Sequence, residues 1–227
     1  MLLLFKQGPV RALGYADDGS LVVCGKDPHT IISLLQKAIN KVTNWGRMNG
    51  LSFSPSKTVA VVFGKTMKQV TKFPSLTIDG EKIVFSSSVK YLGVTIDAKL
   101  QFKQHVTDKC KKATRMLMAA RGLIGKLIGP SPRATKWIYD AILKPIVLYG
   151  AIVWAHRVPS NFRPLIRLQR LAMMGMGHFL PSTPTLGLQI TLGFPPLDIL
   201  AKEEAAKAYI RILGRNPCRW DGTVKVV

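Results

Sequence analysis

Length and composition set the first limits on this chain. It has 227 residues, 47% of them hydrophobic, which is enough for one large domain or two small ones with real cores. Its 33 lysines and arginines against 12 aspartates and glutamates give a formal net charge of +21, which favours a polyanion such as nucleic acid as partner. An anionic membrane surface is the second candidate, but no apolar run approaches the roughly 18 residues of a spanning helix, so we expect no membrane partner.

Cysteine usage indicates the compartment. Cys24, Cys110 and Cys218 are odd in number and widely spaced, and none pairs with a histidine at the spacing of a zinc ligand. The sequence therefore predicts neither a disulfide framework nor a zinc knuckle. No basic leader with a cleavage site is evident, so we expect a nuclear or cytoplasmic protein without a secretion signal.

Two neighbouring carboxylates, Asp17 and Asp18, lie between short apolar runs at residues 10–13 and 21–24. The β-branched residues of these runs predict a β-hairpin with the carboxylates at its tip. Aspartate and glycine suit tight turns, so a solvated hairpin explains the pair. Adjacent carboxylates also offer hard oxygen ligands to Mg²⁺ while leaving room for substrate phosphates. The residues alone leave both interpretations open.

A helix is predicted after the hairpin. Asp27-Pro28 is typical of a helix start and Asn49-Gly50 of its end, with apolar residues recurring at spacings of three and four between them. Residues 58–63 are then a predicted strand, and Lys57 lies in the turn before it. Lys57 is an ordinary solvated lysine unless a catalytic centre is near. There, its ammonium would meet a phosphate or donate a proton to leaving pyrophosphate.

Two further strand signals follow. A hairpin over residues 76–85 is predicted to turn at Asp79-Gly80, and residues 89–96 are the last predicted strand. Gly93 inside that strand indicates a bulge, on an edge strand or where another backbone approaches closely. Strand patterns stop beyond Asp97, and we place a domain boundary there.

The remainder is predicted to be helical. A long helix over residues 101–125 carries a one-sided basic surface, which is either solvated or directed at a phosphate backbone. Further helices are predicted over residues 133–148, with Pro145 as a candidate kink, and over 161–176 and 197–213. Residues 181–196 are predicted to be a connection rich in Thr, Gly and Pro. The basic side chains on the long helix are Lys103, Lys109, Lys111, Lys112, Arg115, Arg121 and Lys126.

Several of these segments, in this order, resemble motifs of a reverse transcriptase of the Jockey-like non-LTR retrotransposons. A lone Tyr-x-Asp-Asp is a weak signal, whereas an ordered series from about residue 10 to 200 is specific. The matching segments are the Tyr15-Ala16-Asp17-Asp18 box, Trp45-Gly46, GLSFSPSKT at 50–58, VKYLGVTID at 89–97, KPIVLYGAIVW at 144–154 and GFPPL at 193–197.

The resemblance implies roles for the singled-out residues. Asp17 and Asp18 would be the metal-site carboxylates of a two-Mg²⁺ polymerase, with Asp17 favoured as the direct ligand. Lys57 would be the general acid or a phosphate contact. The remaining roles concern the primer and template: Tyr15 beside the primer terminus, Tyr91, Leu92 and Gly93 on the primer backbone, and Lys103, Lys111, Lys112 and Arg115 on an RNA/DNA hybrid.

The same resemblance implies the architecture. We expect an α+β fold with the rear of a right-hand polymerase palm, antiparallel strands and a packed helix, in residues 1–97. A thumb helix would occupy residues 98–128 and a helical thumb or connection extension residues 129–227. The expected partners are an RNA template and DNA primer, with deoxynucleoside triphosphates in the complete enzyme.

The family's palm also contains an upstream aspartate and fingers, for which the few residues before Gly14 leave no room. We therefore expect the chain to need the amino-terminal part of the polymerase as partner and to be inactive or nearly so alone. Leu2–Lys6 would be the tail of a palm helix. The alternatives are a non-catalytic remnant that binds RNA or RNA/DNA hybrid, and a decayed copy without a role.

Overall fold

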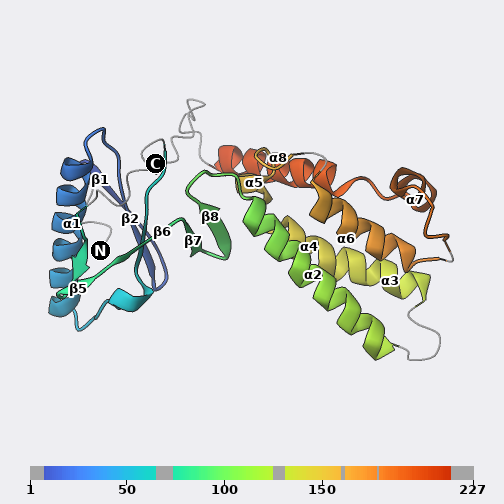
Figure 1. The fold of residues 1–227 in the computed structure, drawn as a ribbon, viewed down its shortest axis with the longest axis horizontal. Coiled ribbons are helices and arrows are strands. Elements are labelled where there is room, and N and C mark those ends of the chain that lie inside the picture. Colours follow the sequence, from blue (N-terminus) through green and yellow to red (C-terminus); the bar gives the residue numbers. More distant parts are fainter. Residues whose placement is uncertain (1–7, 65–73, 125–130, 160–161, 178, 216–227) are drawn as a thin grey trace. The chain divides into compact units, whose positions relative to one another are not determined.

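The computed structural model describes residues 8–64, 74–124, 131–159, 162–177 and 179–215. These residues form two compact units that divide between Lys99 and Leu100, the first rich in strands and the second helical (Figure 1). The predicted α+β class is therefore confirmed. The assignment of the units to palm and thumb stays a prediction, and Leu2–Lys6 and residues 125–130 lie outside the described residues.

The first unit contains one long helix, a short turn of 3₁₀ helix and small two-stranded sheets. The pairs β1–β2, β4–β5 and β7–β8 are antiparallel, whereas β3 and β6 pair in parallel. The elements are β1 (Val10–Tyr15), β2 (Asp18–Val23), α1 (Pro28–Met48), η2 (Pro55–Lys57), β3 (Val59–Val61), β4 (Thr77–Ile78), β5 (Glu81–Lys82), β6 (Val84–Ser86), β7 (Ser88–Tyr91) and β8 (Val94–Asp97).

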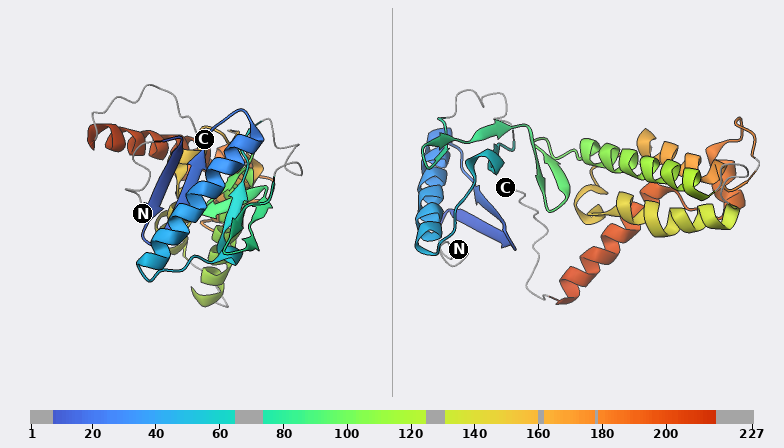
Figure 2. Two further views of the ribbon diagram at one scale, coloured as in Figure 1. Left: turned by 90° about the vertical axis from the view of Figure 1, so that its left-hand side faces the viewer. Right: turned by 90° about the horizontal axis from the view of Figure 1, so that it is seen from below.

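Helix α1 begins and ends as predicted. The Asp27 carboxylate accepts a hydrogen bond of 2.8 Å from the Thr30 amide, and Pro28 occupies the first helical turn. The apolar face of α1 packs on β1, β2 and β4 (Figures 1 and 2). Ile32 contributes to a small core with Leu76, Ile78 and Ile83. This core fixes α1 against the short strands.

The predicted hairpin over residues 76–85 is confirmed in part. Thr77 and Ile78 pair with Lys82 and Glu81 across the Asp79-Gly80 turn, but the chain then leaves this pair and β6 joins β3 instead. The strand predicted over residues 58–63 is shorter, because β3 covers Val59–Val61. Ile83 lies in the chain between the two strand pairs, and its side chain is buried in the small core.

The prediction of one bulged strand over residues 89–96 is wrong. The structure forms a hairpin, in which β7 turns at Leu92-Gly93 into β8 and Tyr91 faces Val94. Leu92 has φ +46° and Gly93 φ +77°, and left-handed values at both central positions are the pattern of a type I′ turn. Alternating side chains continue on both sides of such a short turn, so the residue pattern resembles a single strand.

The second unit is a helical bundle. Helices α2 and α6 pack against each other and against the α3–α4 segment, and α8 packs on α5 and α6 (Figures 1 and 2). The elements are α2 (Lys103–Ile124), α3 (Pro132–Ile138), the π-helix η4 (Tyr139–Leu143), α4 (Lys144–Leu148), α5 (Ala151–Trp154), α6 (Arg163–Met174), α7 (Thr185–Leu192) and α8 (Leu197–Arg215).

A π-helical turn, η4, lies directly before Pro145, where the sequence predicts a kink. The Lys144 amide donates to the Tyr139 carbonyl, five residues back. Proline has no amide hydrogen, so Pro145 cannot donate the usual α-helical hydrogen bond to the carbonyl of residue 141. The wider π-helical turn accommodates this missing bond. Tyr139, Leu143 and Val147 all remain buried on one side of the segment.

The prediction that residues 181–196 form a connection is also wrong, because α7 occupies the middle of this stretch. Its prolines lie before and after the helix, and Gly193 ends it with φ +66°. The Arg170 guanidinium donates hydrogen bonds to the carbonyls of Pro181 and Thr183, both at 2.6 Å. Composition alone does not reveal this anchor. Within the described parts of the chain, no helix is both long and apolar enough to span a bilayer.

Candidate functional site

The β1–β2 hairpin presents the paired carboxylates at its tip, as predicted. Tyr15 pairs with Asp18, and Ala16 and Asp17 are the two residues of the turn. Ala16 has φ +50°, a left-handed value that is uncommon outside glycine and is often found at functional sites. Asp17 and Asp18 therefore come from the turn and from the first residue of β2.

Both carboxylates are exposed and take part in no ion pair or hydrogen bond with a described residue. A pair of Gly residues, Gly14 and Gly19, lies opposite in the register next to the tip. Their lack of side chains leaves one side of the hairpin open beside the carboxylates. The two Asp side chains are thus accessible to a cation or a phosphate-bound metal.

The donor set for such a cation is incomplete among the described residues, where no group of three or more His, Cys, Asp or Glu could hold a metal. Asp17 and Asp18 supply oxygen donors of the type that Mg²⁺ prefers. The two carboxylates fit a Mg²⁺ ion as part of its ligand set and do not form a whole site.

The structure does not join Lys57 to this tip. Lys57 is exposed at the end of η2, and it forms no ion pair with Asp17 or Asp18. Tyr15 is the exposed last residue of β1, next to the turn. Tyr15 is thus grouped with the carboxylates, whereas the role of Lys57 stays a prediction.

A second hairpin tip carries Tyr91, Leu92 and Gly93. Leu92 is exposed at the type I′ turn of β7–β8, and Tyr91 is half-buried beside it. Gly93 is needed there because its φ of +77° lies in the left-handed region. This tip offers backbone groups and an apolar side chain to a ligand.

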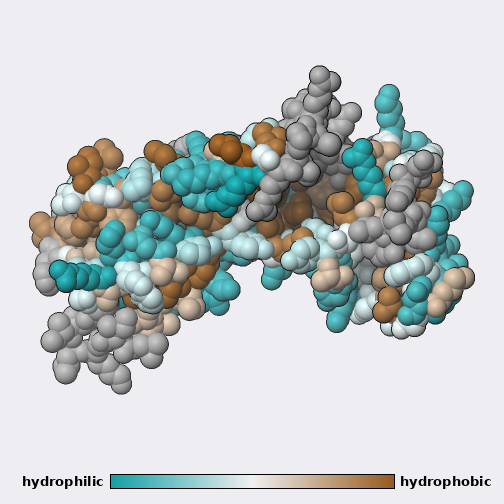
Figure 3. Space-filling model, turned by 180° about the vertical axis from the view of Figure 1, so that it is seen from behind, coloured by the Kyte–Doolittle hydropathy of each residue, from teal (hydrophilic) through white to brown (hydrophobic). Residues whose placement is uncertain are grey.

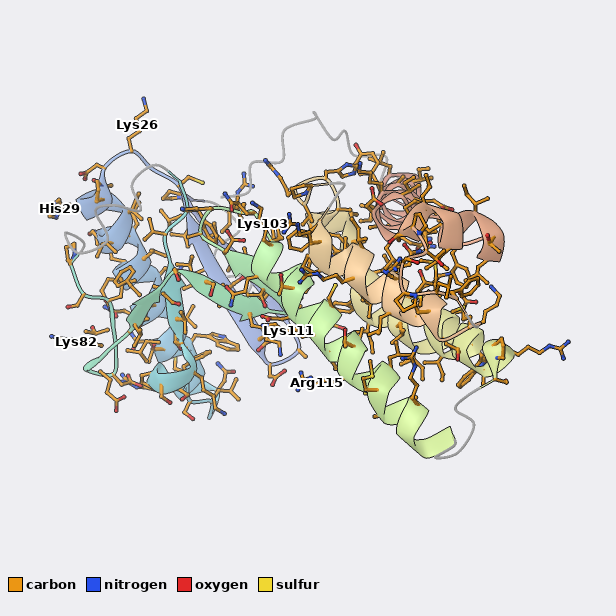
Figure 4. The ribbon with its side chains drawn as sticks, turned by 45° about the vertical axis from the view of Figure 1, so that its right-hand side comes forward. Lys26, His29, Lys82, Lys103, Lys111 and Arg115 are labelled. Atoms are coloured by element: carbon orange, nitrogen blue, oxygen red, sulfur yellow. The ribbon has the colours of Figure 1, made fainter. Side chains whose placement is uncertain are left out.

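The predicted cations of α2 lie on the surface of the helical unit. Lys103, Lys111, Lys112 and Arg115 are exposed, while Val106, Ala113 and Leu117 are buried on the other side of the helix. Figure 4 shows Lys103, Lys111 and Arg115 spaced along α2. Asp108 is the single carboxylate in the helix, so its outer surface is strongly positive.

Lys109 and Arg121, which the sequence groups with these cations, turn to the bundle instead. Lys109 Nζ lies 4.5 Å from the centroid of the Tyr149 ring. Arg121 donates a hydrogen bond of 2.9 Å to the Leu171 carbonyl and lies against Gly175. The number of charges along a helix does not show which cations face the bundle and which face outward. The direction of Arg121 depends on its contact with Gly175, which is distant in the sequence.

Comparisons with known proteins give relatives over most of the chain. It is 32% identical over 196 residues, 85% of its length, to the 115 kDa protein in type-1 retrotransposable element R1DM of Drosophila melanogaster, of which it spans 19%. It is 24% identical to a retrovirus-related Pol polyprotein from type-1 retrotransposable element R1 of Nasonia vitripennis, covering 82% of the chain and 51% of the relative.

A third relative is the RNA-directed DNA polymerase from mobile element jockey of Drosophila melanogaster, at 27% identity over 68% of the chain and 17% of the relative. No family model and no solved structure matches the chain. The chain thus spans between 17% and 51% of the length of these relatives.

Proposed function

Because the chain is homologous over most of its length to the polyproteins and RNA-directed DNA polymerases of non-LTR retrotransposons, we propose that it forms the part of such a polymerase that carries the double-aspartate hairpin. The observation that carries this proposal is the coincidence of that homology with two exposed carboxylates at a hairpin tip. Polymerases of this class need acidic side chains where the growing strand meets the incoming nucleotide.

In this proposal Asp17 and Asp18 contribute oxygen ligands to Mg²⁺, which supplies charge stabilisation for phosphoryl transfer when it is bound. The remaining ligands come from groups other than those of the described residues, which hold no cluster of three. Tyr15 borders the primer end, and Leu92 with Gly93 contacts the primer backbone. Lys57 neutralises phosphate charge.

The outer cations of α2 bind the RNA/DNA hybrid. Lys103, Lys111 and Arg115 are spaced along one exposed side of a helix of 22 residues, which suits a row of phosphates. Phosphate contacts position a duplex without reading its sequence, so this grip is expected to be independent of template sequence. Binding should weaken steeply with salt, since each neutralised phosphate releases counterions.

Primer extension tests the catalytic part of this proposal. In a jockey-type polymerase whose own segment is exchanged for this chain, we expect Asp17→Asn to lower DNA synthesis on an RNA template by more than about 100-fold. Glu81→Gln is the matched control, because Glu81 is another exposed carboxylate of the same unit. Unchanged synthesis by the Asp17→Asn protein would refute the assignment of Asp17.

Hybrid binding by the chain itself tests the second part. We expect Lys111→Gln combined with Arg115→Gln to reduce the slope of log affinity against log salt by about two, roughly one for each lost phosphate contact. Lys207→Gln is the control, because Lys207 pairs with Glu203 and Glu204 on α8. Equal losses in the control would mean that net charge alone drives binding.

A second candidate function is hybrid binding without catalysis by this segment. The absence of a three-ligand metal cluster among the described residues favours it. It predicts that Asp17→Asn with Asp18→Asn leaves hybrid affinity unchanged, and that synthesis in the exchanged polymerase also survives. Loss of synthesis with retained hybrid affinity supports the polymerase assignment instead.

A further inference from the structure

Trp137 on α3 is the most exposed of the aromatic side chains that the structure describes in the helical unit, ahead of Tyr149 and Tyr209. Its exposed fraction is 64%, against 1% for Trp154, whose indole N–H donates a hydrogen bond of 3.1 Å to the Tyr149 carbonyl. No hydrogen bond or ring contact to a described residue engages Trp137. The buried positions beside it are taken by Thr135, Ile138 and Tyr139.

The neighbour of Trp137 on the same side of the helix is a cation. Arg133 precedes it by four residues, a spacing that places two side chains next to each other on a helix surface. Arg133 is exposed and forms no ion pair with a described residue. An arginine beside an open indole combines a phosphate donor with a flat apolar surface.

The surrounding charges favour an anionic ligand. Asp140, the nearest carboxylate in the sequence, is paired with Lys144 at 2.6 Å and with Lys136 at 3.4 Å. Partial burial raises its pKa, but the two lysines together outweigh this and hold the pKa below the ordinary value. From residue 141 to residue 197 the sequence contains five lysines and arginines and no aspartate or glutamate. A protein partner with a basic surface is therefore disfavoured at this position, and a polyanion is favoured.

We propose that Trp137 and Arg133 form a stacking site for an unpaired base of single-stranded RNA. The indole stacks on the base, and the Arg133 guanidinium binds the adjacent phosphate. Base-on-aromatic stacking needs an exposed π-face and tolerates any base, and an exposed tryptophan provides this face. The inference deepens the proposed function, because a polymerase that copies RNA must hold template that is not yet paired.

This site differs from the α2 surface in the nucleic acid that it selects. In a duplex the bases are already stacked on each other, so Trp137 gains little from a hybrid. The α2 cations bind phosphates of either form. The two proposals can therefore fail separately.

Fluorescence and affinity measurements on the whole chain test the site. We expect a 12-nucleotide oligoadenylate RNA to quench tryptophan emission, and Trp137→Phe to abolish most of that quenching while keeping affinity within about threefold. Trp137→Ala should weaken binding of this RNA by roughly 10-fold. Arg133→Gln should weaken it by a smaller factor. Ile190→Ala is the control, because Ile190 is a highly exposed apolar side chain elsewhere in the unit.

A perfectly paired RNA/DNA hybrid of the same length should bind the Trp137→Ala protein as it binds the unsubstituted chain. Oligodeoxyadenylate tests whether the site prefers RNA to DNA. If Trp137→Ala weakens DNA binding as much as RNA binding, the site binds single strands in general and the restriction to RNA is overturned. Unchanged RNA affinity of Trp137→Ala overturns the site. Reduced self-association of that variant in sedimentation, with RNA binding unchanged, would identify a protein contact and also overturn it.

If Lys111→Gln with Arg115→Gln weakens hybrid binding while saturating oligoadenylate still quenches Trp137 emission, the stacking site stands independently of the α2 surface. Loss of both signals in Trp137→Ala, with a matching loss of helical circular dichroism, would reflect misfolding. Trp137→Phe then decides, because it keeps an aromatic face for stacking and should restore both the fold and the RNA affinity.

Discussion

The two units of this chain differ in how deeply they bury their side chains. In the helical unit Val106, Ala113 and Leu117 are 0% exposed, whereas in the strand-rich unit the most buried member of the core, Leu76, is 2% exposed and has few companions. The strand-rich unit presents its carboxylates and its Leu92-Gly93 turn on exposed hairpin tips. The helical unit carries its exposed side chains over a more deeply buried core. Chemistry is thus expected from the thinly packed unit and binding from the densely packed one.

Surface composition sharpens this contrast. Figure 3 shows hydrophobic and hydrophilic side chains interspersed over the face it displays. Among the described residues, Lys136 and Lys144 pair with Asp140 and Lys207 pairs with Glu203 and Glu204 in the helical unit, while in the strand-rich unit Arg47 pairs with Asp79.

The largest effect is expected from the core of the helical unit. Leu117→Ala should lower its free energy of unfolding by about 2 to 5 kcal/mol, because a cavity replaces a fully buried side chain. Met116→Ala, at an exposed neighbouring position, should change it by less than about 0.5 kcal/mol. Hydrogen exchange read separately in residues 8–99 and 100–215 measures this. Equal acceleration in both units would show that they do not unfold independently.

The next effect concerns a buried amide network. Gln169 donates to Tyr139 Oη at 3.1 Å and to the Pro195 carbonyl at 2.8 Å, and its oxygen accepts from Gln189 and from the Leu197 amide. Gln169→Leu should cost about 3 kcal/mol, because several buried polar groups lose their partners. Tyr139→Phe removes one bond and should cost about 1 kcal/mol. Urea denaturation followed by circular dichroism compares them, and equal costs would contradict the network.

A pair of glycines compares the units directly. A Cβ at Gly46 would lie 2.7 Å from the Phe53 ring and 2.9 Å from the Leu51 carbonyl oxygen, so Gly46→Ala should destabilise the strand-rich unit by about 2 kcal/mol. Gly187 in α7 has open space around it, and Gly187→Ala should stabilise the helical unit by about 0.5 to 1 kcal/mol. Effects of the same sign in thermal denaturation would rule out this steric account.

The smallest effect at neutral pH comes from His105, which is buried in the helical unit. Burial and then the nearby Lys109 lower its pKa, while Asp108 and a hydrogen bond with the Tyr149 backbone act the other way. A lowered folded-state pKa means that the unfolded chain binds the proton first as pH falls. Stability should therefore be complete above about pH 6.5 and decrease below it. His105→Gln should remove this decrease from denaturation curves measured between pH 7.5 and 5.

Much of the fold follows from local rules in the sequence. Asp27, Pro28 and Asn49 set the ends of α1, and apolar spacing predicts α2, α6 and α8. The hairpin that carries Asp17 and Asp18 follows from flanking strand formers around a turn. These features depend on residues close in sequence, where capping and periodicity act directly.

What the sequence could not predict depends on distant partners or on backbone conformation. The turn at Leu92-Gly93 needs a leucine in a left-handed conformation, which its residue type does not suggest. The segment before α7 is held by hydrogen bonds from Arg170. Trp137 is exposed because Thr135, Ile138 and Tyr139 occupy the buried side of its helix. The direction of Lys109 and Arg121 likewise depends on α6 and Tyr149.

Residues 141–197 contain five cations and no carboxylate. The stability of the helical unit should therefore depend on the ions and polyanions in solution. Like charges repel in the compact state, and a bound polyanion removes that repulsion. A ligand that binds the folded form alone also shifts the unfolding equilibrium by mass action. If the unit binds RNA as proposed, it should melt at a higher temperature as RNA is added and be least stable at low ionic strength without RNA.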